Sequence, residues 1–331
     1  MKKKMKIVVA SGKGGVGKSM LASCLAMLFA ESKQVVAIDA DVDAPNLHLW
    51  LGLSFEAPPA ARAKEEEEEK STVTEAMVDK WDKVEKISTN ELPIIDLKKC
   101  TGCGKCAEIC AFGALSFTSE VEGVPMLHRG DTSEVAIKKP ILNRFFCEGC
   151  GACEVVCPVK AIKMEKFKNG EIRIKKSIQG FPLVSAQLYP GQTGSGKIVD
   201  LIKKRAEEFK HELMMIDSPA GTGCPVIAAL NGTNFAVLVT EPTPSGLADL
   251  KRVLTVVNHF KIPYRVVINK WDINPSMSNR IKKEFENHFL GQISYDKRVF
   301  QAIADLKPIL KTNLKAKTEI EKIFKRLEKE L

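Results

Sequence analysis

The 331-residue chain has no apolar run that approaches the roughly 20 residues needed to span a bilayer. Its lysine-rich first residues lead into a short apolar strand, and not into the apolar core of a signal peptide. Both absences point to a cytoplasmic protein, and we expect no association with a membrane.

Aromatic residues are scarce, at 6% of the chain, although the net charge is +9. Proteins that bind single-stranded nucleic acid interleave basic side chains with aromatic ones on which the bases stack. Here the lysines are scattered through helical stretches and termini. The positive charge therefore does not predict a nucleic-acid partner. The five histidines are isolated from one another, and we assign them no chemistry.

Eight of the ten cysteines form two runs with the same spacing, C-x2-C-x2-C-x3-C. This spacing is typical of two [4Fe–4S] clusters, because the first three thiolates of a run surround one cluster and the fourth reaches the other. The expected ligand sets therefore cross over between the runs. One set is Cys100, Cys103, Cys106 and Cys157, and the other is Cys147, Cys150, Cys153 and Cys110.

Zinc sites and disulfides are the alternatives for these cysteines. Zinc sites, however, use isolated C-x2-C pairs and have no need of a reciprocal fourth cysteine. Ala111 follows the first run where Pro158 follows the second, a difference that only changes the stiffness of the exit from the loop. Unpaired thiols and oxygen-sensitive clusters also agree with a reducing cytoplasm.

A glycine-rich loop follows the apolar strand at residues 7–10 and precedes an apolar helical stretch at 20–30. This order of elements presents backbone N–H groups and a helix dipole to phosphates. Lys18 is then expected at the β- and γ-phosphates, and Ser19 on Mg²⁺. The predicted nucleotide-binding residues of the loop are Gly12, Lys13, Gly14, Gly15, Val16, Gly17, Lys18, Ser19 and Met20.

Lys13 is an additional lysine, one residue before the paired glycines, that the general phosphate-binding loop does not require. With it the loop resembles that of the deviant-Walker P-loop ATPases, the group that contains MinD, ParA, Mrp and the nitrogenase iron protein. The resemblance implies that Lys13 crosses a dimer interface to the nucleotide of the partner subunit. A solvated loop lysine is the alternative.

Carboxylates follow two further apolar strands, and carboxylates at the C-terminal end of a parallel strand face the ligand crevice. Asp39 and Asp41 resemble the D-x-D of the MinD switch I, which implies that Asp39 lies near Mg²⁺ and Asp41 positions the attacking water. Asp43 is a rival for the second role. Asp217, in the sequence DSPAG, resembles the switch II aspartate that contacts Mg²⁺ through water. Hydrolysis would thus depend on Lys13, Lys18, Asp41 and Asp43.

A later strand ends at Asn269, Lys270 and Asp272, which satisfy the pattern N-K-x-D. Taken alone, this pattern reads guanine in GTPases. The relatives of MinD use an asparagine at this place for adenine, so the whole set of loops favours ATP over GTP.

Residues 191–198 satisfy most of a second phosphate-binding loop. They lack the Ser or Thr needed for Mg²⁺, follow Tyr189 and Pro190 instead of a clean apolar strand, and would compete for one set of aspartates. We interpret them as a loop that borders the first site or a dimer interface, with a second nucleotide site as the alternative.

Strands that alternate with helical stretches before residue 53 and after residue 200 predict one doubly wound parallel sheet of the α/β class. The resemblance implies a P-loop NTPase of the SIMIBI class with an inserted, small α+β ferredoxin domain that holds two [4Fe–4S] clusters. We expect the ATPase domain at 1–56 and 180–331, a connector at 57–90 and the ferredoxin domain at 91–179.

Local patterns add four expectations. Residues 74–86 have some helical character, residues 115–141 are extended, and Asn169 and Gly170 form the type I′ turn of a hairpin. The final stretch, 319–331, is a helix whose apolar face packs on the sheet. Of the two remaining cysteines, Cys24 is expected in the core, and Cys224 either packs or contributes to a transient metal site.

Three functions remain open at this stage. The first is an ATPase whose dimer switching gates electron transfer through two [4Fe–4S] clusters to a redox partner. The second is a cluster-carrying or metallocofactor-assembly ATPase of Mrp type, which would act on an apo-metalloprotein. The third is a positioning ATPase like MinD. All three require ATP and Mg²⁺, and either a homodimer or a heterodimer with a paralogous ATPase.

Overall fold

The computed structural model describes residues 4–53, 81–117 and 139–331. The chain divides into two compact units. The first consists of Met1–Glu85, Glu171–Gln187 and Ser195–Leu331, and the second of Lys86–Gly170 and Leu188–Gly194. The chain therefore passes between the units four times. The expected connector at 57–90 lies outside the described residues as far as residue 80, and so does the first part of the expected helix at 74–86.

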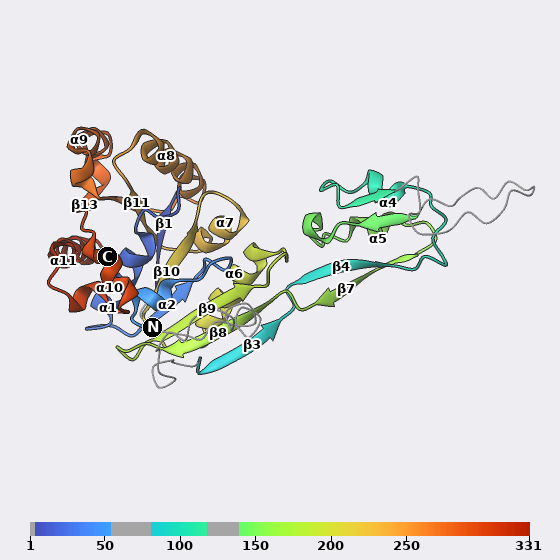
Figure 1. The fold of residues 1–331 in the computed structure, drawn as a ribbon, viewed down its shortest axis with the longest axis horizontal. Helices are drawn as coiled ribbons and strands as arrows, with labels where there is room; N and C mark the ends of the chain where they lie inside the picture. Colours follow the sequence, from blue (N-terminus) through green and yellow to red (C-terminus); the bar gives the residue numbers. More distant parts are fainter. Residues whose placement is uncertain (1–3, 54–80, 118–138) are drawn as a thin grey trace, which may run out of the picture. The chain divides into compact units, whose positions relative to one another are not determined.

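A nine-stranded sheet forms the centre of the first unit, in the order β13-β12-β11-β1-β10-β2-β9-β8-β3 (Figure 1). All pairs from β13 to β9 are parallel, which agrees with the expected α/β fold. The strands are β1 (Met5–Ser11), β2 (Val35–Asp39), β3 (Lys83–Ile87), β8 (Gly170–Lys176), β9 (Pro182–Leu188), β10 (Leu213–Ala220), β11 (Phe235–Thr240), β12 (Tyr264–Asn269) and β13 (Phe289–Ile293).

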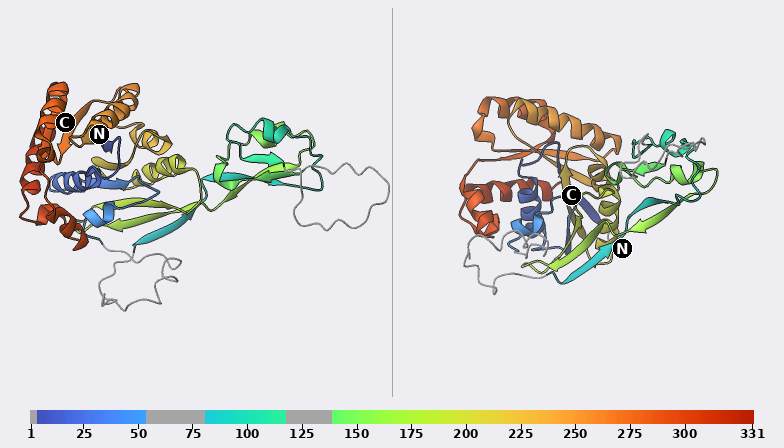
Figure 2. Two further views of the ribbon diagram at one scale, coloured as in Figure 1. Left: turned by 45° about the horizontal axis from the view of Figure 1, so that its top comes forward. Right: turned by 45° about the vertical axis from the view of Figure 1, so that its right-hand side comes forward.

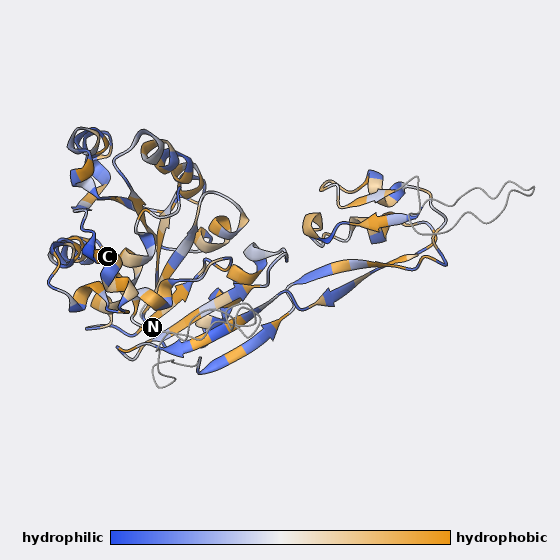
Figure 3. Cartoon of the chain, viewed as in Figure 1, coloured by the Kyte–Doolittle hydropathy of each residue, from blue (hydrophilic) through white to orange (hydrophobic). Residues whose placement is uncertain are grey.

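The central strands are apolar on both faces, because helices cover both (Figures 2 and 3). Ile7 and Val9 of β1 share a core with α1 and α11, whereas Val8, between them, faces the opposite side, where α6, α7 and α8 pack. The helices are α1 (Lys18–Phe29), α2 (Leu47–Trp50), α6 (Ser195–Ala206), α7 (Cys224–Leu230), α8 (Pro244–His259), α9 (Pro275–Glu284), α10 (Arg298–Ala304) and α11 (Lys315–Glu328).

The C-terminal helix α11 packs on the sheet as expected. Ile320, Ile323 and Leu327 are buried, and Phe324 meets Phe29 of α1 edge to face at 4.8 Å. A Cβ at Gly291 of β13 would lie 2.5 Å from Ile323 Cγ1, so glycine permits this close approach. Since the apolar face of α11 is buried in the core, it is not available to a membrane.

Two local expectations at the edge of the sheet are wrong. Lys83–Ile87 is the strand β3, although residues 74–86 were expected to be helical. Asn169 and Gly170 do not turn a hairpin, because β7 (Ile162–Phe167) pairs with β4 (Asn90–Ile95) while β8 belongs to the large sheet. Asn169 is fully buried, and its Oδ1 accepts a hydrogen bond from Thr89 N at 2.9 Å. Tertiary hydrogen bonds therefore replace the local turn.

In its described residues the second unit contains two small antiparallel sheets, two short α-helices and a 3-10 helix at Arg144–Phe146. β4 pairs with β7, and β5 (Leu115–Phe117) pairs with β6 (Pro140–Leu142). The ends of the stretch at 115–141 are thus extended, and its centre lies outside the described residues. The helices α4 (Lys105–Glu108) and α5 (Ala152–Val156) each begin after a glycine with a left-handed backbone, Gly104 and Gly151. Each lies within one cysteine run.

Candidate nucleotide and metal sites

The glycine-rich loop connects β1 directly to α1, which begins at Lys18. Gly17 has a φ of +89°, and a Cβ there would lie 2.3 Å from Asn269 Nδ2, so both its conformation and its surroundings require glycine. Asn269, at the end of β12, donates a hydrogen bond from Nδ2 to Val16 O at 2.8 Å. The end of β12 therefore stabilises the phosphate-binding loop through a hydrogen bond to its backbone.

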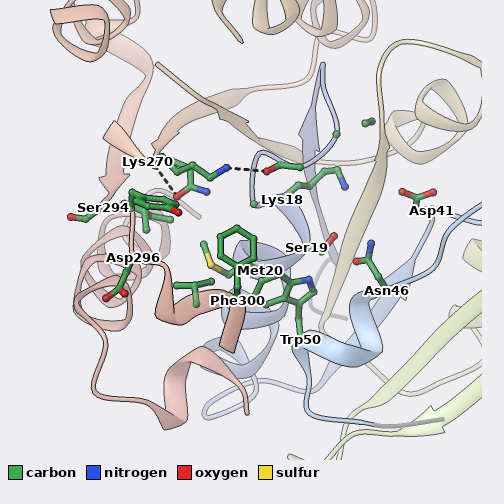
Figure 4. Close-up of a pocket in the computed structure, with 18 residues that line it drawn as sticks. Lys18, Ser19, Met20, Asp41, Asn46, Trp50, Lys270, Ser294, Asp296 and Phe300 are labelled. Carbon is green, nitrogen blue, oxygen red and sulfur yellow. Dashed lines mark hydrogen bonds between the residues drawn. The ribbon is translucent and has the colours of Figure 1, made fainter. Parts of the chain in front are cut away.

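A cavity of about 250 Å³ lies at the carboxyl edge of the sheet, beside this loop (Figure 4). Lys18, Ser19 and Asp41 lie toward one side of it, and Met20, Trp50 and Phe300 supply apolar surface (Figure 4). The full lining is Gly14, Gly15, Gly17, Lys18, Ser19, Met20, Asp41, Asn46, Trp50, Ala220, Asn269, Lys270, Ile293, Ser294, Tyr295, Asp296, Val299 and Phe300.

Two buried aspartates lie next to each other at the ends of adjacent strands. Asp39 of β2 and Asp217 of β10 are register partners, and both side chains are inaccessible to solvent. Lys18 Nζ lies 3.4 Å from Asp217 Oδ1. Asp217 Oδ2 is buried and has no hydrogen-bond partner among the described residues. An orphaned carboxylate oxygen beside Lys18 and Ser19 fits a divalent cation or its water.

The protonation of these aspartates follows from their burial. Burial raises the pKa of Asp39 to about 8, and the charge of Asp217 adds to the rise. Burial also raises the pKa of Asp217, against the opposing effect of Lys18. Two carboxylates that share a buried site resist ionising together. A divalent cation would remove this penalty, so the pair suits the metal side of a nucleotide site.

Asp41 and Asp43, the two rivals for the water-positioning role, lie in different surroundings. Asp41 lines the cavity, and burial raises its pKa while Lys18 opposes the rise. Its Oδ1 accepts a hydrogen bond from Ala44 N at 3.4 Å. Asp43 is exposed and does not line the cavity; its carbonyl accepts a hydrogen bond from Gln187. Asp41 is therefore the better placed of the two.

Within the N-K-x-D pattern, Lys270 and Asp272 make different contacts. Lys270 forms an ion pair with Glu241, and its Nζ lies 3.4 Å from Gly15 O, so it supports the phosphate-binding loop. Asp272 does not line the cavity, and its Oδ1 accepts a hydrogen bond from Tyr295 N at 2.7 Å. Asp272 thus anchors the loop after β13, which carries Ser294, Tyr295 and Asp296 to the cavity.

Several residues of the cavity were not among the predicted binding residues, notably Asn46, Trp50, Ser294, Tyr295 and Phe300. The sequence could have indicated the stretch after β13, because side chains that follow a parallel strand lie at the carboxyl edge of the sheet. It could not have indicated Trp50 and Phe300, since both come from helices whose position depends on tertiary packing. Lys13 is exposed and does not line the cavity of its own chain.

In the second unit the cysteines line two separate cavities, each with cysteines from both runs. One cavity is lined by Cys110, Cys147, Cys150 and Cys153. The other is lined by Cys100, Cys103, Cys106 and Cys157. The fourth cysteine of each run therefore lies with the first three of the other run, which is the crossed arrangement expected from the spacing.

The two fourth cysteines have equivalent backbone contacts. Ala114 N donates to Cys110 Sγ at 3.3 Å, and Ala161 N donates to Cys157 Sγ at 3.2 Å, each four residues further along the chain. Burial raises the pKa of the Cys153 thiol to about 11, which makes its bare thiolate unfavourable. N–H donors to sulfur and buried thiols both suit a site whose thiolates are bound to iron.

Among the described residues, no three His, Cys, Asp or Glu side chains form a group that could hold one metal ion. Cys24 is buried in α1, as expected, and Cys224 is exposed at the start of α7.

A parallel sheet, a phosphate-binding loop and paired aspartates at its carboxyl edge define a P-loop nucleotide-binding protein. Residues 7–309 match the CobQ/CobB/MinD/ParA nucleotide binding domain, and the chain belongs to this family of MinD/ParA-type ATPases.

An uncharacterized protein of Methanocaldococcus jannaschii, MJ0578, is 33% identical over 325 residues, which are 98% of this chain and 96% of that protein. The iron-sulfur cluster carrier protein of the same organism is 46% identical over 61 residues, 18% of this chain and 21% of its own length. The structure of the cell division ATPase MinD of Pyrococcus furiosus has a TM-score of 0.54 at 18% identity. The match covers 99% of this chain and 100% of that one, and it is a likeness of fold.

None of the described helices is both long and apolar enough to cross a membrane.

Proposed function

We propose that the chain is an ATP-hydrolysing iron-sulfur protein in which nucleotide-driven dimer switching gates electron transfer through two [4Fe–4S] clusters. The observation that carries the proposal is the crossed lining of two cavities by eight cysteines. Membership of an ATPase family supplies the nucleotide half, and the iron-sulfur half rests on the cysteines and on the short similarity to a cluster carrier.

The residues of the first unit divide the work of hydrolysis, in which ATP and water yield ADP and phosphate. Lys18 would bind the β- and γ-phosphates, and Ser19, Asp39 and Asp217 would hold Mg²⁺ or its water. Asp41 would orient the attacking water, since it lies in the cavity beside Lys18. When bound, Mg²⁺ neutralises the charge that develops on the phosphates.

The eight cysteines of the second unit would hold the clusters. Each cluster supplies a centre that takes up one electron and releases it again. An external electron donor reduces the protein, and a redox partner accepts the electron, so that no net charge accumulates. Cys103 and Cys150 are exposed, one in each run, and give both sites an open side.

An Mrp-type carrier or assembly ATPase is the second candidate. It is favoured by the 61 residues shared with the iron-sulfur cluster carrier protein. In that case an apo-metalloprotein would replace the redox partner, and a cluster, not an electron, would leave. Two complete cysteine sets favour permanent centres, because a transferable cluster needs fewer protein ligands.

The crossed ligand sets have a direct test. Anaerobically purified protein should contain about eight iron atoms per chain. Cys110→Ser should remove the electron paramagnetic resonance signal that Cys150→Ser removes, and Cys157→Ser the signal that Cys103→Ser removes. Cys224→Ser, outside both runs, is the control and should keep both signals. Zinc in place of iron, or signals lost within one run only, would contradict the proposal.

The choice between electron transfer and cluster delivery requires a second experiment. Loaded protein is incubated anaerobically with ADP or a non-hydrolysable ATP analogue, and both the iron that remains and the midpoint potentials are measured. Nucleotide-dependent potentials with full iron retention support gated electron transfer. Transfer of iron to an apo-protein in one nucleotide state supports the carrier instead.

A further inference from the structure

The P-loop-like segment Gly191 to Gly194 packs against the second cysteine run. Gly191 has a φ of +74°, and a Cβ there would lie 2.7 Å from Phe145 Cε1. Gly194 has a φ of +96°, and a Cβ would lie 3.4 Å from Asn169 Nδ2. The glycines that made this segment resemble a phosphate-binding loop therefore permit close packing within the second unit.

Thr193 lies between these glycines and connects buried side chains to a cysteine. Its hydroxyl donates to Cys147 O at 2.9 Å and accepts from Asn90 Nδ2 at 2.8 Å. Its carbonyl accepts from Asn169 Nδ2 at 3.0 Å. Asn90 and Asn169 are fully buried, so these bonds form away from competing water. Cys147 is the first cysteine of the second run, and its loop is thus held by Thr193.

The segment continues directly into the nucleotide-binding unit. The chain leaves the second unit at Gly194, and α6 begins at Ser195. Within the first unit, a Cβ at Gly196 of α6 would lie 3.3 Å from Cys224, at the start of α7. Lys203 of α6 donates to the carbonyls of Ala228, at 2.7 Å, and of Asn231, at the other end of α7.

Helix α7 follows the predicted switch II, which begins at Asp217 and ends at Gly221 only three residues before Cys224. Gly221 has a φ of +99°, a backbone conformation that allows this loop to change its direction. A change at Asp217 on nucleotide binding would therefore move α7, and α6 is fastened to both ends of α7. From α6 the chain reaches Thr193 within two residues.

We propose that Thr193 is the positioning residue through which nucleotide state reaches the cluster held by Cys147, Cys150, Cys153 and Cys110. The inference rests on the proposed function, since it requires both clusters. Hydrogen bonds to the sulfurs and exposure to solvent set the reduction potential of a cluster. Thr193 bonds to the carbonyl of Cys147 and so fixes the loop that carries this ligand; a displaced Thr193 would move that loop and change the potential of this cluster and not of the other. By linkage, reduction of the cluster changes nucleotide affinity by the same factor.

The test uses the full chain with both clusters loaded, titrated anaerobically with Mg²⁺ and either ADP or a non-hydrolysable ATP analogue. Cys150→Ser identifies the signal of the cluster concerned. In the wild type we expect its midpoint to differ between the nucleotides by about 59 mV, the equivalent of a tenfold difference in affinity. The other cluster, expected at Cys100, Cys103, Cys106 and Cys157, is the internal control. Its midpoint potential should be the same with both nucleotides.

Three variants test the role of Thr193. Thr193→Val keeps the shape but removes the hydroxyl, and should abolish the nucleotide-dependent shift while iron content and nucleotide binding stay unchanged. Thr193→Ser restores a hydroxyl and should restore the shift. Lys203→Met removes the hydrogen bonds between α6 and α7 and leaves the cysteine loop unchanged, and it should also abolish the nucleotide-dependent shift. It therefore tests the same connection if Thr193→Val loses iron.

The outcomes separate this inference from the function it rests on. A wild-type shift that persists in Thr193→Val and Lys203→Met overturns the role of Thr193 and leaves gating intact. Two loaded clusters without any nucleotide-dependent shift overturn both gating and this inference. A protein that binds no iron overturns the proposed function itself.

Discussion

At the scale of single residues, the first unit concentrates negative charge where it is least tolerated. Asp39 and Asp217 are fully buried register partners on adjacent strands, and of these two Asp217 is the one that Lys18 contacts. Asp39 instead accepts hydrogen bonds from Leu47 N at 2.8 Å and Asp41 N at 3.2 Å. A cation bound here would relieve the repulsion between the two carboxylates, and without a cation their charge depends on protonation.

This arrangement predicts how stability changes with pH when Mg²⁺ is absent. The pKa of Asp39 is about 8 in the folded chain, against about 3.9 for an unfolded aspartate. Between these values the folded state holds the proton that the unfolded state has released. The free energy of unfolding should therefore fall as pH rises from about 4 to about 8, by at most about 1.4 kcal/mol per pH unit.

Urea unfolding of the nucleotide-binding unit can be followed by fluorescence, because Trp50, Trp81 and Trp271 all lie in it. Asp39→Asn should flatten the pH dependence, and the exposed Asp43→Asn is the matched control that should follow the wild type. Mg²⁺ should protect the wild type most at high pH. Equal slopes for the wild type and Asp39→Asn would show that Asp39 does not carry the effect.

At the scale of secondary-structure elements, the end of β12 connects the phosphate-binding loop to the base side of the cavity. Asn269 bonds to Val16 of the loop, and Lys270 N donates to Asn269 Oδ1 at 3.0 Å. Asp272 holds the stretch after β13 through Tyr295 N. The pattern N-K-x-D is thus a set of contacts between three loops, and its aspartate lies outside the cavity lining.

We therefore expect Asn269 and Asp272 to affect nucleotide binding differently. Asn269→Ala leaves a buried carbonyl unsatisfied, at a cost of about 1–3 kcal/mol, and should weaken binding of ATP and GTP alike by about tenfold or more. Asp272→Asn retains an acceptor for Tyr295 N and should leave the preference for ATP over GTP unchanged. Competition binding measures both. A preference that collapses in Asp272→Asn would instead assign base reading to this residue.

At the scale of the whole molecule, Lys13 does not contribute to the nucleotide cavity of its own chain. This lysine is exposed and outside the cavity, whereas Lys18 is 7% exposed and contacts Asp217. The position of Lys13 suits a role toward another subunit, which is what the likeness to deviant-Walker ATPases implies. A dimer would then be needed for turnover, though not for binding.

Two single variants and their mixture test this role. Lys18→Ala should lose nucleotide binding, and Lys13→Ala should bind but neither dimerise with ATP in ultracentrifugation nor hydrolyse it. In an equimolar mixture, Lys18→Ala subunits can supply Lys13 to nucleotide bound by Lys13→Ala subunits, so part of the activity should return. No recovery, or a Lys13→Ala protein that behaves as wild type, would exclude action across subunits.

Features that depend on chain-local chemistry could be predicted from the sequence alone. The loop before Lys18 has its geometry set by glycines and by the order of strand and helix, and the cysteine runs by the reach of three thiolates within one loop. The buried face of α11 follows from helical periodicity in the same way. In each case the pattern that allows the prediction lies within one short stretch of the chain.

Other features were decided only by tertiary structure, because the groups that compete for a residue come from distant parts of the chain. Asn169 and Gly170 have the sequence of a tight turn, yet the bonds from Asn169 to Thr89 and Thr193 hold the backbone between two sheets. The segment Gly191 to Gly194 has the glycines of a phosphate-binding loop and lies between β9 and α6, yet its glycines pack against Phe145, Asn90 and Asn169 of distant parts of the chain. Local propensity proposes a conformation, and burial against long-range partners decides whether it forms.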